Sequence, residues 1–240
     1  MVSSMLKTMR TKLIKWSWAL FGAVAKKMSN SSSTHAGKDL NHIIWQEVCS
    51  NMSFPQGATI LDAGCGGGHL VQCLAESGCH AVGVDFVPRF IGNTHGDFVL
   101  ADVRNLPFRD KTFDAIVCYS VMQYLGGAEV AQLVLHELAR LVKDSGQVLL
   151  GEVIQCRGYF NRHILSSDLS WVRKLLLLAY LNSPLYQYYF INTASWVGMF
   201  QAAGFTCQVA DESPEMPYHA NMKHYILTKA MGQGRASVDA

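Results

Sequence analysis

A glycine-rich segment at residues 58–68, ATILDAGCGGG, places the strongest constraint on how this chain can fold. Its first residues form a short apolar run that is typical of a buried strand, and Asp62 follows that run directly. Glycines then occupy every second position before an apolar helical pattern begins at Leu70. Glycines allow the backbone to approach a ligand closely, and the start of a helix presents unpaired N–H groups. The segment therefore predicts a ligand-binding turn between a strand and a helix.

Further along the chain, short apolar segments alternate with patterns of helical spacing. We expect strands at 81–84, 98–100, 112–119 and 147–153, and helices at 38–52, 128–143 and 193–203. This alternation is typical of an α/β fold whose doubly wound, mostly parallel sheet is covered on both faces. The last two apolar segments, 205–210 and 224–229, predict an antiparallel pair at the edge of the sheet.

Acidic side chains stand at or just after the ends of three of the predicted strands. These are Asp62, Asp85 and Asp102. The carboxyl ends of parallel strands meet at one edge of a sheet, where α/β proteins bind their ligands. A carboxylate at Asp85 can accept two hydrogen bonds from a ribose diol. Asp62, directly before the turn, suits a cationic group better than a pyrophosphate.

The glycine turn does not match the G-x-G-x-x-G pattern of dinucleotide-binding folds. Counting from Gly64, the sixth position is His69, and counting from Gly66 it is Val71. The spacing therefore argues against a dinucleotide as the ligand.

Composition restricts the remaining classes of function. The chain has 240 residues, 50% of them hydrophobic, which is enough for one domain of ordinary size with an appendage. Its net charge of +2 gives no argument for a nucleic-acid partner, and we expect none. The seven cysteines show no C-x-x-C spacing, so we expect neither a metal site nor a disulfide framework, and a cytoplasmic location.

Residues 1–27 differ from the rest of the chain because they are basic and no acid precedes Asp39. Three interpretations stay open: an amphipathic helix in peripheral contact with an anionic membrane surface, a helix packed on the domain, or a secretory signal. A polar SNSSS segment at 29–33 marks the domain boundary. We therefore expect a basic helical arm and linker at 1–33, a domain at 34–231 and a flexible tail at 232–240.

The segment DAGCGGG resembles the D-x-G-x-G-x-G motif of class I S-adenosylmethionine-dependent methyltransferases. The similarity continues through GVD at 83–85, ADVRNLPFRDKTFD at 101–114 and HELARLVKDSGQVLLGEV at 136–153. It is greatest to the small-molecule subgroup, in which LPF-x-x-x-x-FD is a frequent landmark. The resemblance implies a Rossmann-like methyltransferase fold, S-adenosyl-L-methionine as cofactor, and a substrate-covering insertion at about 155–192.

The resemblance also implies roles for individual residues. The glycine turn would approach the methionine part of the cofactor, Asp85 would bind the ribose hydroxyls, and Phe86 would flank the adenine. Asp102 would bind the adenine amine, and the backbone of Tyr119 would close the site beside the sulfonium. The expected cofactor-binding residues are Asp62, Ala63, Gly64, Cys65, Gly66, Asp85, Phe86, Asp102, Val103 and Tyr119.

Methyl transfer depends mainly on aligning a nucleophile with an activated methyl group, and an oxygen nucleophile also needs a base. We expect a small, apolar or aromatic acceptor that is methylated on oxygen rather than on nitrogen or carbon. Two alternatives stay open: a non-catalytic cofactor-binding partner subunit, and an enzyme at the membrane surface with a lipid or quinone-like acceptor. The candidate catalytic groups near the rim of the site are His163, His219, His224 and Tyr124.

Overall fold

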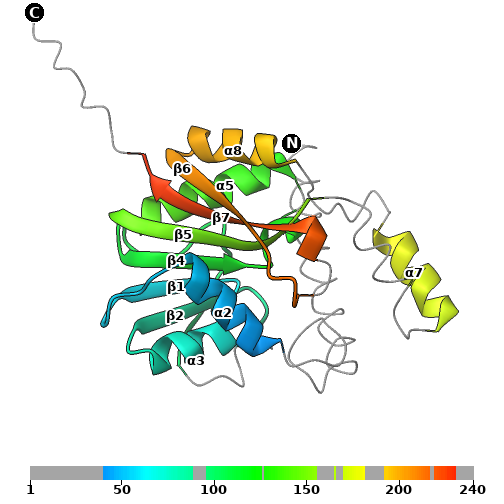
Figure 1. Cartoon of the computed structure of the whole chain (residues 1–240), viewed down its shortest axis with the longest axis horizontal. Helices are drawn as coiled ribbons and strands as arrows, with labels where there is room; N and C mark the ends of the chain where they lie inside the picture. The colour runs from blue at the N-terminus through cyan, green and yellow to red at the C-terminus, as the bar shows by residue number, and fades with distance from the viewer. Residues whose placement is uncertain are drawn as a thin grey trace, which may run out of the picture.

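A mixed β-sheet lies at the centre of the protein in the computed structural model (Figure 1). The structure describes residues 40–88, 96–125, 127–155, 165, 170–181, 192–216 and 219–230. Within these residues the strands are β1 (Thr59–Ala63), β2 (His80–Asp85), β3 (Asp97–Leu100), β4 (Phe113–Tyr119), β5 (Val142–Ile154), β6 (Phe205–Asp211) and β7 (Met222–Lys229). The helices are α2 (Asn41–Asn51), α3 (His69–Glu76), α5 (Ala128–Leu141), α7 (Trp171–Leu181) and α8 (Thr193–Ala202), with short 3-10 turns η1 (Met122–Tyr124) and η2 (His219–Asn221).

The order of the described strands across the sheet is β3-β2-β1-β4-β5-β7-β6. Strands β1 to β5 run parallel, whereas β7 runs antiparallel to both of its neighbours, β5 and β6. The predicted α/β class, with its antiparallel pair at the C-terminal edge, is confirmed. The order reverses between β1 and β4, and such a switch point is where parallel sheets of this kind open a crevice for ligands.

Two apolar cores lie on opposite faces of the sheet. Ile60 of β1 packs in the core that includes α2 and α3, whereas its neighbour Leu61 packs in the core that includes α5 and α8. Val148 and Leu149 of β5 divide between the two cores in the same way. Successive side chains of a strand point to opposite faces, so a strand covered on both sides must be apolar throughout. This explains the continuous apolar runs in the sequence.

Helix α5 covers one face with a stripe of buried side chains. The members of this stripe recur every three or four residues, and they are Ala131, Val134, Leu135, Leu138 and Leu141. This spacing places them on one side of a helix with 3.6 residues per turn. The predicted helix at 128–143 is therefore present, although it ends at Leu141, where β5 begins at the next residue.

Arg140, in the last turn of α5, holds the loop that precedes β4. Its guanidinium donates to the carbonyl oxygens of Leu106 at 3.2 Å and Phe108 at 2.8 Å. It also pairs with Asp110 and Glu137, each at 2.7 Å, and Glu137 accepts a bond from the N–H of Leu106 at 2.7 Å. The LPFRDKTFD landmark is thus a loop that is fastened to a helix by charge-assisted hydrogen bonds.

Some of the sequence predictions concern residues outside the described part of the chain. They include the arm and linker at 1–33, the tail at 232–240 and most of the insertion at about 155–192, of which α7 is described. The predicted domain boundaries therefore stay predictions. Among the described residues, no helix combines the length and apolar character that crossing a membrane requires.

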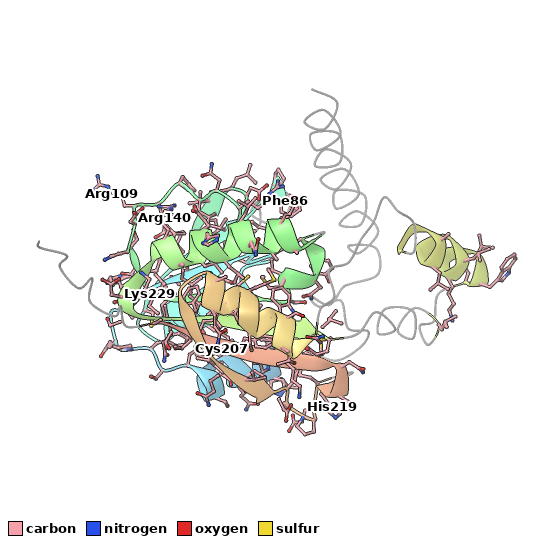
Figure 2. All side chains as sticks on the ribbon, turned by 90° about the horizontal axis from the view of Figure 1, so that it is seen from above. Phe86, Arg109, Arg140, Cys207, His219 and Lys229 are labelled. Atoms are coloured by element: carbon pink, nitrogen blue, oxygen red, sulfur yellow. The ribbon has the colours of Figure 1, made fainter. Side chains whose placement is uncertain are left out.

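We expect Arg140→Ala to lower the free energy of unfolding by roughly 2 kcal/mol, because two carbonyl groups and two carboxylates lose their donor. Urea denaturation at pH 7 measures this loss. Arg109→Ala is the matched control, since Arg109 is exposed and points away from the fold (Figure 2). The control should change the free energy by less than about 0.5 kcal/mol. Equal losses in both variants would contradict the role of Arg140.

Candidate active site

The turn between β1 and α3 lies against two neighbouring loops. Gly64 has a φ of +89°, and a Cβ at this position would stand 2.4 Å from Cγ2 of Val121, so only glycine fits. The N–H groups of Gly64 and Cys65 both donate to the carbonyl oxygen of Val84, at 2.7 and 2.9 Å. Ala63 is fully buried directly before the turn. The turn is therefore fixed between the end of β2 and the loop after β4.

Asp85 fastens the same turn through its carboxylate. Its Oδ2 accepts a hydrogen bond from the N–H of Gly66 at 3.0 Å, and its Oδ1 accepts one from the N–H of Val87 at 2.9 Å. Burial raises the pKa of Asp85, while the backbone donors at Val87, Gly66 and Phe86 oppose that rise. Three backbone donors leave about one of the four lone-pair sites of this carboxylate for a ligand. The predicted ribose contact stays a prediction, and the structure adds a positioning role.

Asp62 is the last residue but one of β1 and is only 3% exposed. Its burial, followed by the negative charge of Asp85, raises the pKa of Asp62 to about 7. Two buried carboxylates at one turn repel each other, and a cation bound beside them relieves that repulsion. The electrostatics of the turn therefore favour a positively charged ligand and disfavour a pyrophosphate.

The residues predicted to surround an adenine ring lie after β2 and β3. Phe86 is half-buried, and Val103 is buried. Asp102 pairs with Arg104, whose Nε donates to Oδ1 at 2.8 Å and whose Nη2 donates to Oδ2 at 2.5 Å. An adenine amine at this place would share the carboxylate with a guanidinium. The adenine contacts of Phe86, Asp102 and Val103 stay predictions.

Two strained residues lie on the other side of the turn. Ser120, directly after β4, has a φ of +58°, and Glu152 of β5 has a φ of +52°. The N–H of Ser120 donates to the carbonyl oxygen of Gly151 at 2.9 Å, so the two strained positions are neighbours across the β4–β5 pair. The left-handed conformation costs a non-glycine residue roughly 1–2 kcal/mol, and such strain gathers at functional sites. The strain marks this region as part of a candidate functional site.

Tyr119 is the last residue of β4, directly before the strained Ser120, and its side chain is buried. A Cβ at Gly151 would stand 2.1 Å from Cδ2 of the Tyr119 ring, so Gly151 leaves the space that this ring fills. The Tyr119 hydroxyl donates to Oε1 of Glu212 at 3.3 Å. Burial, reinforced by the charges of nearby glutamates, raises the pKa of Tyr119, so the phenol stays protonated.

Of the predicted catalytic candidates, His163 lies outside the described residues. Tyr124 is half-buried in η1, where its N–H donates to the carbonyl oxygen of Val121, close to the glycine turn. His219 is exposed and contacts the carbonyl oxygen of Met216 at 3.2 Å. Figure 2 shows His219 at the opposite side of the molecule from Phe86. The described candidates therefore do not converge on one point.

The expectation that His224 lies at the rim is wrong, because this side chain is fully buried. Its Nε2 lies 2.6 Å from Oε2 of Glu47, and its Nδ1 accepts a hydrogen bond from the N–H of Glu152 at 3.2 Å. Burial lowers the pKa of His224, although the charge of Glu47 opposes this. Both ring nitrogens are occupied, so His224 is not available as a base for an acceptor.

The sequence predictions miss two buried acids near this histidine. Glu47 of α2 is 7% exposed, and Glu212, which follows β6, is 4% exposed. Glu47 stands four residues after Ile43, which places an acid on the apolar side of the predicted helix, and that signal could have revealed it. Glu212 lies in the polar segment ADESPE at 210–215, where nothing distinguishes it from a surface acid.

Comparison with known families supports the interpretation of the turn. The family described as "Methyltransferase domain" matches residues 61–150, from β1 into β5. Residues 61–150 therefore carry a methyltransferase domain of the class I S-adenosylmethionine-dependent type. In this family the methyl donor is S-adenosyl-L-methionine.

Relatives of the methyltransferase domain act on different acceptors. The chain is similar to the tRNA (carboxymethyluridine(34)-5-O)-methyltransferase of Arabidopsis thaliana, with 31% identity over 110 residues, 44% of this chain and 27% of that protein. It is also similar to the ubiquinone biosynthesis O-methyltransferase of Xylella fastidiosa, with 27% identity over 122 residues, 47% of this chain and 48% of that protein. The chain thus spans between about a quarter and a half of the length of these relatives.

The fold is shared with solved methyltransferase structures. One is a chain from the complex between the Trm112 methyltransferase activator and a methyltransferase of Haloferax volcanii, with a TM-score of 0.66 and 17% identity. The alignment covers 90% of this chain and 97% of that chain. At this level of identity the likeness concerns the fold.

The methyltransferase domain has a turn that fits S-adenosyl-L-methionine. The buried carboxylates of Asp62 and Asp85 match its positive charge, and Gly64 provides a close approach of the backbone. When bound, this cofactor supplies a methyl group that is activated by a positively charged sulfur. The predicted contacts of individual residues with the cofactor stay predictions.

We expect Asp62→Asn to stabilise the cofactor-free protein at high pH. The unfolded carboxyl ionises near about pH 4, whereas the folded one keeps its proton up to a pKa of about 7. The wild-type protein therefore loses stability as the pH rises from about 4 to 7, and the variant avoids this loss. The difference in Tm, variant minus wild type, should grow by roughly 2–6 °C between pH 5 and pH 8.

Scanning calorimetry without cofactor, at both pH values, measures this difference. Asp97→Asn, at an exposed position of β3, is the control for replacing a surface carboxylate. A difference for Asp62→Asn that is constant, or that shrinks as the pH rises, would contradict the burial of an ionisable group at this position.

Proposed function

We propose that this protein transfers the methyl group of S-adenosyl-L-methionine to an oxygen atom of a small, apolar or aromatic acceptor. The observation that carries the proposal is the pair of buried carboxylates, Asp62 and Asp85, at the glycine turn. A sulfonium cation relieves their repulsion more than the uncharged thioether of the demethylated product does. This difference favours binding of the methyl donor over its product.

The acceptor side of the proposal is supported by the packing around the turn. Val121 lies against Gly64, and it follows the strained Ser120 directly. The loop after β4 therefore connects the cofactor turn with the polar groups of β5. Oxygen as the methylated atom is supported by the printed names of the Arabidopsis and Xylella relatives, both of which are O-methyltransferases.

The cofactor part of the proposal is tested by isothermal titration calorimetry of the full chain with S-adenosyl-L-methionine and with its demethylated product. We expect both to bind, and we expect Asp85→Asn to weaken binding roughly 10- to 100-fold, which is about 1–3 kcal/mol. Asp97→Asn is again the control and should bind normally. Absence of binding by the wild-type protein to either compound would refute the proposal.

Catalysis is tested separately from binding, by the formation of demethylated cofactor in the presence of phenols and alcohols. Turnover with hydroxylated compounds, and none with their methyl ethers, is the expected result. A protein that binds the cofactor tightly and turns over none of these acceptors would instead support the role of a non-catalytic partner subunit.

We also propose that residues 1–27, which lie outside the described residues, contact an anionic membrane surface. The support is their charge, since no acid precedes Asp39 and the basic residues are Lys7, Arg10, Lys12, Lys15, Lys26 and Lys27. Each basic residue near such a surface contributes roughly 1 kcal/mol. A contact of this kind would bring the domain to lipid-soluble acceptors, such as quinone-like compounds.

The triple variant Lys7→Glu, Lys15→Glu and Lys26→Glu should co-sediment with phosphatidylserine vesicles at least about 10-fold less than the wild-type chain. Neutral phosphatidylcholine vesicles serve as the control, on which the two proteins should behave alike. Equal sedimentation of both proteins with the anionic vesicles would exclude a charge-driven contact of this arm.

A further inference from the structure

A cluster of buried ionisable side chains lies near the carboxyl ends of β4 and β5, and of its members only Tyr119 belongs to the predicted cofactor contacts. Its members come from distant parts of the sequence, and they are Glu47, Tyr119, Glu152, Glu212 and His224. Buried charges of one sign are costly, so a fold keeps such a cluster only where something uses it. Within the described part of the chain, no three His, Cys, Asp or Glu side chains are placed to hold a metal ion.

One half of this cluster is satisfied by the protein itself. The Glu47 carboxylate lies 2.6 Å from Nε2 of His224 through Oε2, and its Oε1 accepts the N–H of Ser213 at 2.7 Å. His224 also accepts the N–H of Glu152 at 3.2 Å. Because Nδ1 is an acceptor, the ring is neutral and Nε2 carries the proton towards Glu47. This half connects α2 to the sheet and positions the backbone of Glu152.

The other half of the cluster contains Glu212, and the neighbouring Gln123 resembles it because each side chain has a buried oxygen without a partner among the described residues. Oε1 of Gln123 and Oε2 of Glu212 are buried, and neither has a hydrogen-bond partner among the residues that the structure describes. The two side chains belong to residues that are 2% and 4% exposed. A buried polar atom without a partner lowers the stability of the fold by about as much as a lost hydrogen bond does. Each of these atoms is therefore suited to a hydrogen bond with a bound ligand.

Gln123 is linked to the cofactor turn by a short series of contacts, and Glu212 is reached through the hydroxyl of Tyr119, the residue before Ser120. Nε2 of Gln123 donates to Oγ of Ser120 at 3.0 Å, and Ser120 also bonds to the carboxylate of Glu152. The next residue, Val121, is the one that lies against Gly64 of the turn. The cluster is therefore joined to the place where the activated methyl group is expected.

We propose that Glu152, Gln123 and Glu212 form the acceptor site, and that Glu152 takes the proton from an acceptor hydroxyl during methyl transfer. This inference rests on the proposed function. The acceptor class is a compound with two neighbouring hydroxyl groups, of which one faces Glu152 and the other donates to Oε1 of Gln123. The reacting oxygen forms a bond to the methyl carbon while the methyl–sulfur bond breaks and its electron pair stays on sulfur. The hydroxyl proton moves to the Glu152 carboxylate.

The environments of the two acids support different roles for them. Burial raises the pKa of Glu152 to about 7, although a hydrogen bond from Ser120 opposes the rise. Burial and the charges of Glu152 and Glu47 raise the pKa of Glu212 to about 9. Near neutral pH, Glu152 is therefore partly ionised and can accept a proton, whereas Glu212 keeps its own and can donate to an acceptor oxygen. Acids whose pKa values are held apart in this way are typical of acid–base pairs.

The test follows the two carboxyl groups directly, by NMR of the full chain labelled with carbon-13 at glutamate Cδ and saturated with demethylated cofactor. The signals are assigned by their loss in Glu152→Gln and Glu212→Gln. Catechol is the probe, and 1,2-dimethoxybenzene, which has the same ring and no hydroxyl hydrogen, is the control compound. We expect catechol to shift both signals in a saturable way and 1,2-dimethoxybenzene to shift neither.

Glu152→Gln should weaken catechol binding at least 10-fold, whereas the exposed control Glu215→Gln should not change it. If the cofactor product binds and catechol leaves both carboxyl signals unchanged, or if 1,2-dimethoxybenzene shifts them equally, the acceptor site is refuted while the proposed function stands. Absence of cofactor binding would instead refute the proposed function. If Glu152→Gln does not fold, Glu152→Asp assigns the signal instead, because it also removes the labelled glutamate, and the titration of the wild-type chain then decides between these results.

Discussion

The parallel pairing of β1 with both β2 and β4 is the constraint on which the rest of the site depends. In this register Asp62 stands level with Gly83 of β2 and with Val117 of β4, so three strands end at nearly the same height. The loops that follow these strands are therefore forced together. The loop after β4 comes so close to the glycine turn that Val121 leaves no room for a side chain at Gly64. A parallel sheet gains this arrangement because all its carboxyl ends meet at one edge.

Buried acids recur on both sides of that edge, and they work against the stability of the fold. Asp62 at the glycine turn and Glu152 of β5 both have a pKa raised to about 7 by burial. Replacing groups of this kind with neutral ones commonly stabilises a protein, at the cost of its function. The strained backbone of Ser120 and Glu152 adds a second local cost at the same place.

Hydrophobic periodicity was sufficient to predict most of the described strands and helices, because each apolar run is covered on both faces of the sheet. The buried side chains of α5 lie on one side of the helix, and Ile60 and Leu61 pack in the cores on opposite faces of the sheet. Both arrangements leave a periodic apolar pattern in the sequence. The candidate site was predicted only where its residues lie at the carboxyl end of a strand, as Asp62 and Asp85 do. His224 was misplaced, because a histidine in a strand-like segment gives no sign of whether it points to solvent or to a buried acid.

The sequence by itself determined the family, the order of strands and helices, and the glycine turn, because these depend on local spacing and on the covalent neighbours of each residue. Only the tertiary structure decided which acids meet. Glu47, Glu152 and Glu212 come from one helix, one strand and one loop, and no local pattern couples them. Their burial and the raised pKa values of Glu152 and Glu212 arise from packing across the sheet edge, as does the absence of a partner for Oε1 of Gln123 among the described residues. Desolvation and charge repulsion act through space, so they become visible only once the chain is folded.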